Sequence, residues 1–400
     1  MDRVVISGVG CCTSLGWEPE GIARAFVQGR TAFAPSADLP GYPVCPLADP
    51  GEDAASARLG AWRHRRYLSR GAGFAVLSGL RAAASAGFDP HMPPQTCLIG
   101  ASGPTLDFAR EPGLPPAPDE ALDALWLLRW LPNTANTALA RFLGIHGEGL
   151  VLGTACASAL QAIGEGFRRV RSGLSDAVLC VAGDSRLSSG GLLGYAKAHA
   201  LSRHPVPGEA SRPFDEARDG FVPGEGGAAF VLEPLEAARA RGAAVFAEVL
   251  GFGASLDGGA LTAPDESARY AEAAVRAALA DAGLGPEGVD WISAHGTGTP
   301  LNDRGEALLL ERVFSGRSPA VAALKSWIGH GSAACGGLEL ALMIACARAG
   351  RFPPIRNLGA PCSGRLDFAL APRPFPGPVG LLENFGFGGQ NAALLVRLCI

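Results

Sequence analysis

The segment GLVLGTACASALQAIGEGFRRVRSG, residues 149–173, joins a strand, a cysteine and a helix in one short stretch. Residues 149–153 are mostly apolar and end in glycine, which is typical of a strand followed by a turn. From residue 157 onward, apolar residues recur at helical spacing, arginines gather in the last turns and Gly173 follows, as expected where a helix ends. Cys156 is therefore predicted at the N-terminus of this helix, where the helix dipole favours a thiolate.

The same alternation of apolar strands and alanine-rich helices continues along the chain, and it predicts an α/β fold with helices covering the sheet faces. The segments VVISGVG (4–10) and AEVLGFGAS (247–255) resemble each other. This similarity indicates an internal duplication. We expect an N-terminal half at residues 1–240, which carries the cysteine, and a C-terminal half at residues 241–400.

The composition excludes several classes of protein. The chain has 400 residues, 48% of them hydrophobic and 18% charged, with a net charge of −4, so it can bury a large core and is not expected to bind nucleic acid. The sequence shows no signal peptide and no apolar run long enough to span a membrane, which predicts a cytoplasmic protein. Its ten cysteines form no C-x-x-C pair, which indicates a reducing compartment and no metal site.

A second strand-end loop lies in the segment AHGTGTPLND, residues 294–303. The predicted strand 289–294 ends directly before His295, and Thr297 and Thr299 alternate with glycines, as hydrogen-bond donors along a ligand channel would. Asp303 and Glu306 have the spacing of a capping box for the helix that follows.

A third loop contains Lys325 and His330, five residues apart after another predicted strand. The chain has only one other lysine, Lys197, so a compact ammonium group at this point suggests a specific use. Glu339 lies on an otherwise apolar helix and needs a partner, because burying a lone carboxylate is costly. A fourth, glycine-rich loop at 384–389 offers backbone N–H groups that suit an oxyanion hole.

These groups fit one reaction class, in which a thiolate accepts an acyl group and neutral histidines stabilise a developing enolate. The chain also resembles a known family, the β-ketoacyl-acyl carrier protein synthases of the synthase II type, which are condensing enzymes of the thiolase superfamily. The motifs that carry the resemblance are TACASA (154–159), RPFDEARDGFVPGEGG (212–227), HGTGTPLND (295–303), LKSWIGH (324–330) and NFGFGGQNA (384–392). The resemblance implies a five-layered αβαβα fold with internal pseudo-twofold symmetry, and a dimer.

The resemblance also implies roles for individual residues. Cys156 would carry the acyl chain, and His295 and His330 would promote decarboxylation of a malonyl group and stabilise its enolate. Lys325 would orient the site. The further implied roles are support by Glu339 and Asp303, an oxyanion hole from the backbone N–H groups of Cys156 and Phe387, a gate at Phe387, and contacts to the phosphopantetheine arm at Thr297 and Thr299.

The partner implied by the resemblance is an acidic acyl carrier protein, which would bring the substrates on its phosphopantetheine; no tightly bound cofactor is expected. The residues predicted to dock this carrier are Arg63, Arg65, Arg66, Arg70 and Arg203. The chain would form a homodimer, or a heterodimer with a ketosynthase-like chain-length factor.

The sequence departs from the family pattern after His330, where Ala333 and Cys335 replace the usual Gly and Ala. The Pro-rich segment 101–132 also departs, and we expect it at the dimer contact and the far end of the acyl pocket. Fatty-acid synthesis and specialised polyketide or polyene synthesis both stay open. Two alternatives remain: a catalytic subunit that works only with a chain-length factor, and an acyltransferase that does not condense.

Overall fold

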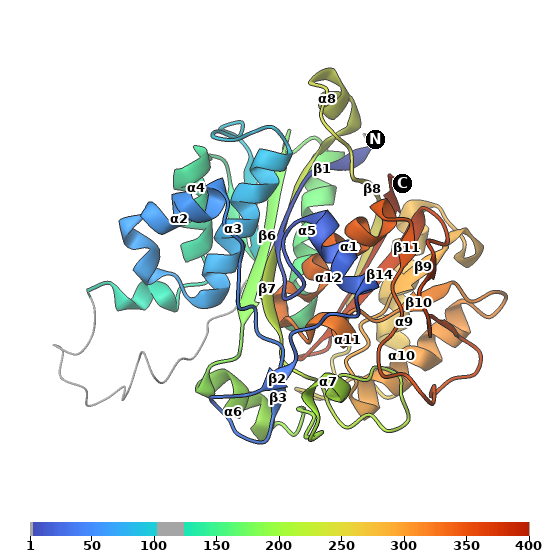
Figure 1. Ribbon diagram of the computed structural model, residues 1–400. Helices are drawn as coiled ribbons and strands as arrows, with labels where there is room; N and C mark the ends of the chain where they lie inside the picture. Colours follow the sequence, from blue (N-terminus) through green and yellow to red (C-terminus); the bar gives the residue numbers. More distant parts are fainter. Residues whose placement is uncertain (1–2, 102–123, 400) are drawn as a thin grey trace.

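The structure is a computed structural model that describes residues 3–101 and 124–399, in which strands and helices alternate as the sequence predicts (Figure 1). The strands of its main sheet are β1 (Val4–Cys12), β4 (Cys97–Ala101), β5 (Gly149–Val151), β6 (Val178–Ser185), β7 (Glu225–Pro234), β8 (Ala247–Leu256), β9 (Trp291–Ser293), β10 (Ala320–Ala322), β12 (Asp367–Phe368), β14 (Val379–Gly386) and β15 (Gln390–Leu398). Two small two-stranded sheets pair β2 (Ala34–Pro35) with β3 (Pro43–Val44), and β11 (Arg351–Phe352) with β13 (Arg373–Pro374).

The α-helices are α1 (Pro19–Val27), α2 (Ala54–Ala61), α3 (Arg70–Ser85), α4 (Thr134–Leu143), α5 (Ser158–Arg171), α6 (Ser189–Lys197), α7 (Pro207–Ala210), α8 (Leu235–Ala240), α9 (Arg269–Ala282), α10 (Pro300–Val313), α11 (Lys325–Ile328) and α12 (Cys335–Arg348). Short 3-10 turns lie at η1 (Arg63–Tyr67), η3 (Trp126–Arg129), η4 (Ala155–Ala157), η5 (Pro286–Gly288) and η6 (Ser332–Ala334).

The strand order shows the internal duplication. The sheet runs β12-β10-β9-β14-β15-β8-β1-β7-β6-β4-β5. Within each half, β5-β4-β6-β7-β1 and β10-β9-β14-β15-β8 follow the same order. The directions also agree, because β4 is parallel to β5 and β6 as β9 is to β10 and β14, while the remaining pairs are antiparallel. The two halves meet where β1 pairs with β8.

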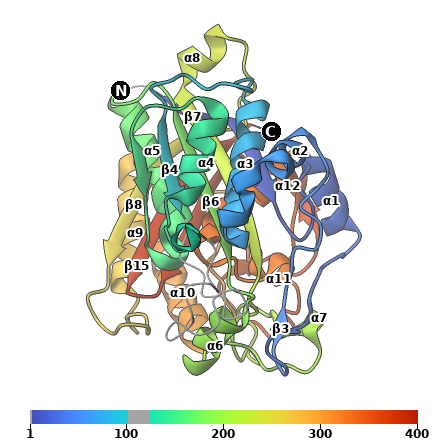
Figure 2. The same cartoon turned by 90° about the vertical axis from the view of Figure 1, so that its left-hand side faces the viewer.

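The two halves of the sheet and the helices on either side of each half form five layers, as the views in Figures 1 and 2 show. Helix α3 packs on β1, β6 and β7, and α9 packs on β8 and β15, so each covers an outer face. Helices α5 and α12 pack against each other and against strands of both halves. They form the central layer, within the largest of the hydrophobic clusters. The predicted thiolase-like fold is confirmed.

Helix α12 takes this central position because its sequence, CGGLELALMIACAR, is apolar on nearly all sides. A helix of this kind is stable only when it is surrounded by protein, and every residue from Cys335 to Ala347 is buried. The single acidic residue of the helix, Glu339, is fully buried with the rest. The chain therefore has to supply that carboxylate with partners inside the molecule.

The duplication also decides where the chemistry lies. The loop between β5 and α5 carries Cys156, and the corresponding loop between β10 and α12 carries His330. Because α5 and α12 lie side by side in the central layer, the segments that lead into them meet in the middle of the molecule.

The boundary between the two halves and the place of the Pro-rich segment stay predictions. The boundary between residues 240 and 241 is one, since β1 joins the two halves in a single sheet. The other concerns the Pro-rich segment, most of which lies outside the described residues. None of the helices in the described ranges is both long and apolar enough to cross a membrane.

The close packing of α5 can be tested at Gly164. A Cβ atom there would lie 2.3 Å from the ring of Phe252, so we expect Gly164→Ala to lower the free energy of unfolding by about 1–3 kcal/mol through overpacking. Gly21→Ala in α1 is the matched control, because its Cβ would meet nothing nearer than 3.9 Å; it should be neutral or stabilising by up to ~1 kcal/mol. Urea denaturation measures both, and equal effects would contradict the packing argument.

Candidate active site

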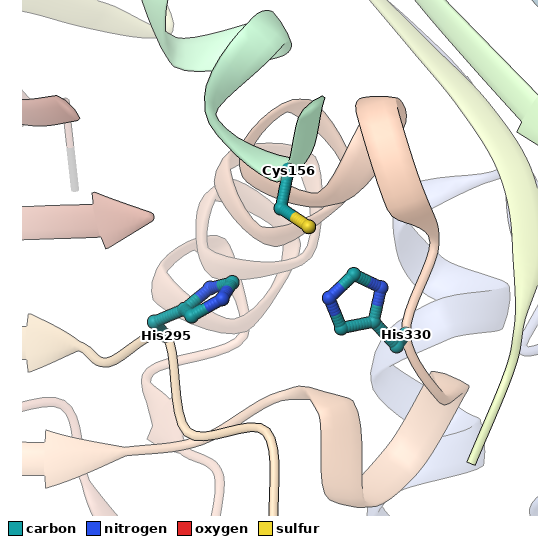
Figure 3. Close-up of side chains that lie close together, drawn as sticks. All are labelled: Cys156, His295 and His330. Atoms are coloured by element: carbon teal, nitrogen blue, oxygen red, sulfur yellow. The ribbon is translucent and has the colours of Figure 1, made fainter. Parts of the chain in front are cut away.

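Three side chains from separate loops meet in the centre of the molecule: Cys156, His295 and His330. One potential ligand atom from each lies within 4.8 Å of the others, and all three residues are buried. Figure 3 shows the cysteine sulfur pointing toward the space between the two imidazole rings. The ring centroids are 5.7 Å apart and the rings are nearly perpendicular. The structure thus brings together the predicted cysteine and both predicted histidines.

Cys156 lies in the 3-10 turn η4, directly before α5. The preceding Ala155 has a φ of 49°, a left-handed conformation that non-glycine residues rarely adopt. This turn is held by the Ser158 hydroxyl, which accepts from the Thr154 N–H and donates to the Ala155 carbonyl. The cysteine is therefore presented on a sharp turn at the entrance to the helix, as the sequence predicted.

The expected low pKa of the Cys156 thiol is wrong for the resting protein. Burial raises the pKa of this thiol to about 11, although the charge of Lys325 and the backbone N–H groups of Phe387 and Cys156 lower it in part. Removing the thiolate from water costs more than the Lys325 charge and these backbone N–H groups return. The resting group is a thiol that needs substrate chemistry to lose its proton.

His295 is fixed by a buried lysine and an asparagine. The Lys325 Nζ lies 2.6 Å from the His295 carbonyl oxygen and 3.2 Å from its Nδ1, and the Asn384 Nδ2 lies 3.2 Å from the same Nδ1. Both neighbours of Nδ1 are donors, so Nδ1 accepts and the ring proton is on Nε2. Burial and then the Lys325 charge hold the pKa of His295 well below its usual value.

Lys325 keeps its charge because it forms an ion pair with a buried carboxylate. Its Nζ donates to the Glu339 Oε1 at 2.5 Å, and the other Glu339 oxygen accepts from Asn384 at 2.9 Å. Burial is the largest effect and opposes the charge on Lys325, but Glu339, together with Cys335 and Glu306, raises the pKa of Lys325 overall. Glu339 thus has the partners that its place on an apolar helix requires.

His330 has the same tautomer as His295 for a different reason. Its Nδ1 accepts from the Ser332 backbone N–H at 3.0 Å, and the Cys335 sulfur lies 3.6 Å from the same atom. The ring proton is therefore on Nε2. Burial, followed by the Lys325 charge, lowers the pKa of His330 to about 3.

Both rings are neutral near pH 7 and both carry their proton on Nε2. A metal ion needs an unprotonated ring nitrogen, so this hydrogen-bond pattern disfavours metal ligation by Nε2 of either ring. It favours the donation of two N–H hydrogen bonds to an oxygen that develops negative charge.

Asp303 and Glu306 form no capping box, and that prediction is wrong. Helix α10 begins at Pro300 with Thr299 as its N-cap, so both acidic residues lie inside the helix and reach back to the loop before it. Asp303 accepts from the backbone N–H groups of Thr297 and Gly298, and Glu306 from those of His295 and Gly296. The two carboxylates hold the whole histidine loop in place.

A cavity extends from Cys156 to the molecular surface. Thr297 and Thr299 line it, and their hydroxyls are 2.9 Å apart. Phe387, which is 38% exposed, lies in the wall of this cavity beside Cys156. The remaining lining residues are Tyr195, Phe221, Asp257, Thr262, Pro264, His295, Asn302, His330, Phe385, Gly386 and Asn391.

The predicted docking arginines differ in their surroundings. Arg63, Arg65 and Arg66 lie on η1, and no carboxylate in the described ranges forms an ion pair with them. Arg70 instead binds both oxygens of the buried Glu225. Arg203 lies apart from them in sequence and contacts the ring and hydroxyl of Tyr42.

Sequence reasoning missed two residues of the site. Asn384 contacts both His295 and Glu339, and its place directly before the FGFGG loop is a signal that could have found it. Glu306 was expected only as a cap, although it supports the His295 backbone. The signal was its place, together with Asp303, on a helix face whose other buried residues are apolar.

Comparison with known proteins shows the family to which the chain belongs. The family model described as "Beta-ketoacyl synthase, N-terminal domain" matches residues 1–238, and "Beta-ketoacyl synthase, C-terminal domain" matches residues 246–359. The chain is 31% identical to a 3-oxoacyl-acyl-carrier-protein synthase 2 of Synechocystis over 99% of this chain and 98% of that one. It is 32% identical to the enzyme of that name from Coxiella burnetii, over 98% of each chain.

Solved structures show the same likeness. A beta-ketoacyl synthase from Burkholderia phymatum is 30% identical and superposes with a TM-score of 0.91 over the full length of both chains. A structure named the ishigamide ketosynthase/chain length factor is also 30% identical, with a TM-score of 0.87 and full coverage of both chains. With two family models that together span most of its length and full-length relatives of this kind, the chain belongs to the beta-ketoacyl synthase family of condensing enzymes.

Proposed function

We propose that this protein catalyses the decarboxylative Claisen condensation of an acyl group held on Cys156 with malonyl-acyl carrier protein, giving β-ketoacyl-acyl carrier protein. The observation that carries the proposal is the buried cluster of one thiol and two neutral imidazoles, each with its proton on Nε2. Membership in the condensing-enzyme family supports the same reaction class.

In the first step, the Cys156 sulfur attacks the thioester carbonyl of an acyl carrier. The carbon–sulfur bond to the carrier breaks, and the proton of the Cys156 thiol passes to the released carrier thiol. The backbone N–H groups of Cys156 and Phe387, which already lower the pKa of the Cys156 thiol, would bind the oxyanion. Transfer of this proton to the leaving thiol suits a cysteine that is not ionised before the substrate binds.

In the second step, a malonyl thioester loses CO₂ and leaves an enolate. The Nε2–H groups of His295 and His330 donate to its oxygen, because neutral donors placed beforehand stabilise charge that develops in the reaction. The enolate carbon attacks the acyl group on Cys156, and the cysteine leaves as a thiolate that then takes up a proton. Lys325 and Glu339 act on this step by fixing His295.

Thr297 and Thr299 are proposed to hydrogen-bond the phosphopantetheine arm, since both line the cavity that leads to Cys156. Phe387 is proposed as the gate of that cavity. An acidic carrier protein would dock on Arg63, Arg65, Arg66, Arg70 and Arg203. In support, Arg65, Arg66 and Arg70 line one surface groove, although Arg70 already shares its charge with Glu225.

The partner subunit and the pathway are also part of the proposal. The name of one 30% identical structure describes a ketosynthase with a chain length factor, and other relatives are 3-oxoacyl-acyl-carrier-protein synthases. We therefore propose a dimer, either of two such chains or with a chain-length factor, in fatty-acid or polyketide synthesis. We also propose a cytoplasmic location, because all ten cysteines are free thiols, as is usual in a reducing compartment.

Replacing the nucleophile tests the first step. Cys156→Ala should lower the rate of β-ketoacyl product formation from acyl- and malonyl-carrier protein by at least ~10³-fold, because no covalent acyl group can form. The control is Cys346→Ala, which removes another buried thiol, near the end of α12. Product is measured by mass spectrometry of the carrier. Normal product from the Cys156 variant would refute the assignment.

Replacing the histidines tests the second step and separates condensation from simple acyl transfer. We expect His295→Ala and His330→Ala each to reduce CO₂ release from malonyl-carrier protein by roughly 10²–10⁴-fold, since each removes one donor to the enolate. Acylation of Cys156 should be affected less, and intact-protein mass spectrometry reports it separately. Wild-type protein that acylates Cys156 but never releases CO₂ would support the non-condensing acyltransferase instead.

The raised pKa of the Cys156 thiol predicts how its alkylation depends on pH. Only the thiolate reacts, and with a pKa of about 11 its fraction should rise about tenfold for each pH unit between pH 7 and 9. Iodoacetamide labelling followed by peptide mass spectrometry measures the rate at Cys156. A rate that is already constant above pH 7 would show a thiolate in the resting protein and contradict this account.

A further inference from the structure

Tyr195 lies in the wall of the cavity that leads to Cys156, and the proposed mechanism does not use it. Its side chain comes from α6, near the end of that helix. The Tyr195 hydroxyl lies 3.0 Å from the hydroxyl of Ser332, the first residue of the turn η6 that separates His330 from α12. One hydrogen bond therefore joins the cavity wall to the loop that carries His330.

Ser332 has a strained backbone. Its φ is 51°, a left-handed conformation that is unfavourable for a residue with a side chain. Such residues persist only where contacts with the surrounding structure hold them. The N–H of this same residue donates to the His330 Nδ1 at 3.0 Å. The strained conformation thus places the donor that fixes the tautomer of His330.

Other hydrogen bonds hold the backbone on either side of Ser332. The backbone N–H and carbonyl of His330 bond to residues 222–224, at 2.7 and 2.9 Å. Ala333, which follows Ser332, donates its N–H to the buried Asp184 carboxylate at 3.2 Å. These bonds fix the chain before and after Ser332, whereas the tyrosine hydroxyl holds its side chain.

The ring of Tyr195 has a separate part in the packing of the cavity wall. It makes edge contacts with Phe221, at a centroid distance of 5.1 Å, and with Phe387, at 6.4 Å. Phe221 in turn packs against the His330 ring at 4.7 Å. Tyr195→Phe keeps these ring contacts and removes only the hydroxyl, so the hydrogen bond can be tested apart from the packing.

We propose that Tyr195 is a positioning residue for His330. Its hydroxyl holds the Ser332 side chain, so that the Ser332 N–H stays on the His330 Nδ1 and the ring proton stays on Nε2. Tyr195 acts through Ser332 and not on a reacting atom. The hydrogen-bonded link is a property of the folded protein, and only its kinetic consequence rests on the proposed condensation.

The link can be observed without any assay of activity. The ¹⁵N spectrum of histidine-labelled protein reports the hydrogen bonding of each ring nitrogen, and His330→Gln identifies the signals of His330 among the seven histidines. Tyr195→Phe and Ser332→Ala should both shift the His330 Nδ1 signal, because the Ser332 N–H is no longer held on that atom. The His295 signals should stay in place, since a different set of donors holds that ring.

Tyr270→Phe is the matched control for this spectrum. Tyr270 lies on α9, which packs on the outer face of the C-terminal half of the sheet, so the substitution removes the same hydroxyl from an unrelated helix. A His330 signal that moves no further in Tyr195→Phe than in Tyr270→Phe would overturn the proposal, whether or not the protein condenses.

A double-mutant cycle tests the consequence for the reaction. Tyr195→Phe, Ser332→Ala and the double variant should each lower CO₂ release from malonyl-carrier protein by roughly 3–10-fold, as expected for one lost hydrogen bond, because all three break the same bond. Acylation of Cys156, which does not use His330, should change by less than ~2-fold. Effects of the two single substitutions that multiply in the double variant would overturn the role of the bond.

The same measurements separate positioning from two other roles of Tyr195. A hydroxyl that bound the acyl chain would change the acylation of Cys156 and leave the His330 signals in place. A hydroxyl that only filled space would slow acylation and CO₂ release equally. Either result would overturn the positioning role. A shifted His330 signal in Tyr195→Phe, together with wild-type protein that releases no CO₂, would support the link while the proposed condensation failed.

Discussion

The buried ammonium group of Lys325 is the charge on which the rest of the site depends. Its three short contacts, to the His295 carbonyl, the His295 ring and Glu339, fix one histidine in a single tautomer. The same charge lowers the pKa values of His295 and His330 and opposes the burial effect on Cys156. Without Lys325, Glu339 would be an unpaired carboxylate inside an apolar helix, which is among the costliest changes a core can undergo.

The duplicated fold explains how residues so distant in sequence reach this charge. In each half, a parallel strand (β5 or β10) leads into the loop before the central helix (α5 or α12). The two central helices pack against each other. Cys156 and His330 therefore come from equivalent loops of the two halves. His295 comes from the loop after β9, and two carboxylates on α10 bind the backbone of that loop. A rigid framework of this kind holds hydrogen-bond donors where charge develops, which is the principal requirement of enolate chemistry.

The electrostatics of the site suit a reaction that starts from neutral groups. Cys156 is protonated at rest, and both imidazoles are uncharged, so acyl transfer must move the cysteine proton to the departing thiol. The cysteine stays protonated because burial destabilises the thiolate by more than the Lys325 charge and the backbone N–H groups of Phe387 and Cys156 stabilise it.

The sequence alone determined the α/β class, the duplication and the loops that carry Cys156, His295, Lys325 and His330, because strand ends, glycines and helix signals are local features. It also indicated that Glu339 needs a partner. Only the tertiary structure decided which groups meet. Asp303 and Glu306 looked like caps by their spacing, yet they reach back to the histidine loop. Asn384 gained its role from contacts with His295 and Glu339, which lie far away in sequence. The pKa of Cys156 was likewise decided by tertiary structure, since desolvation depends on every layer packed around the thiol.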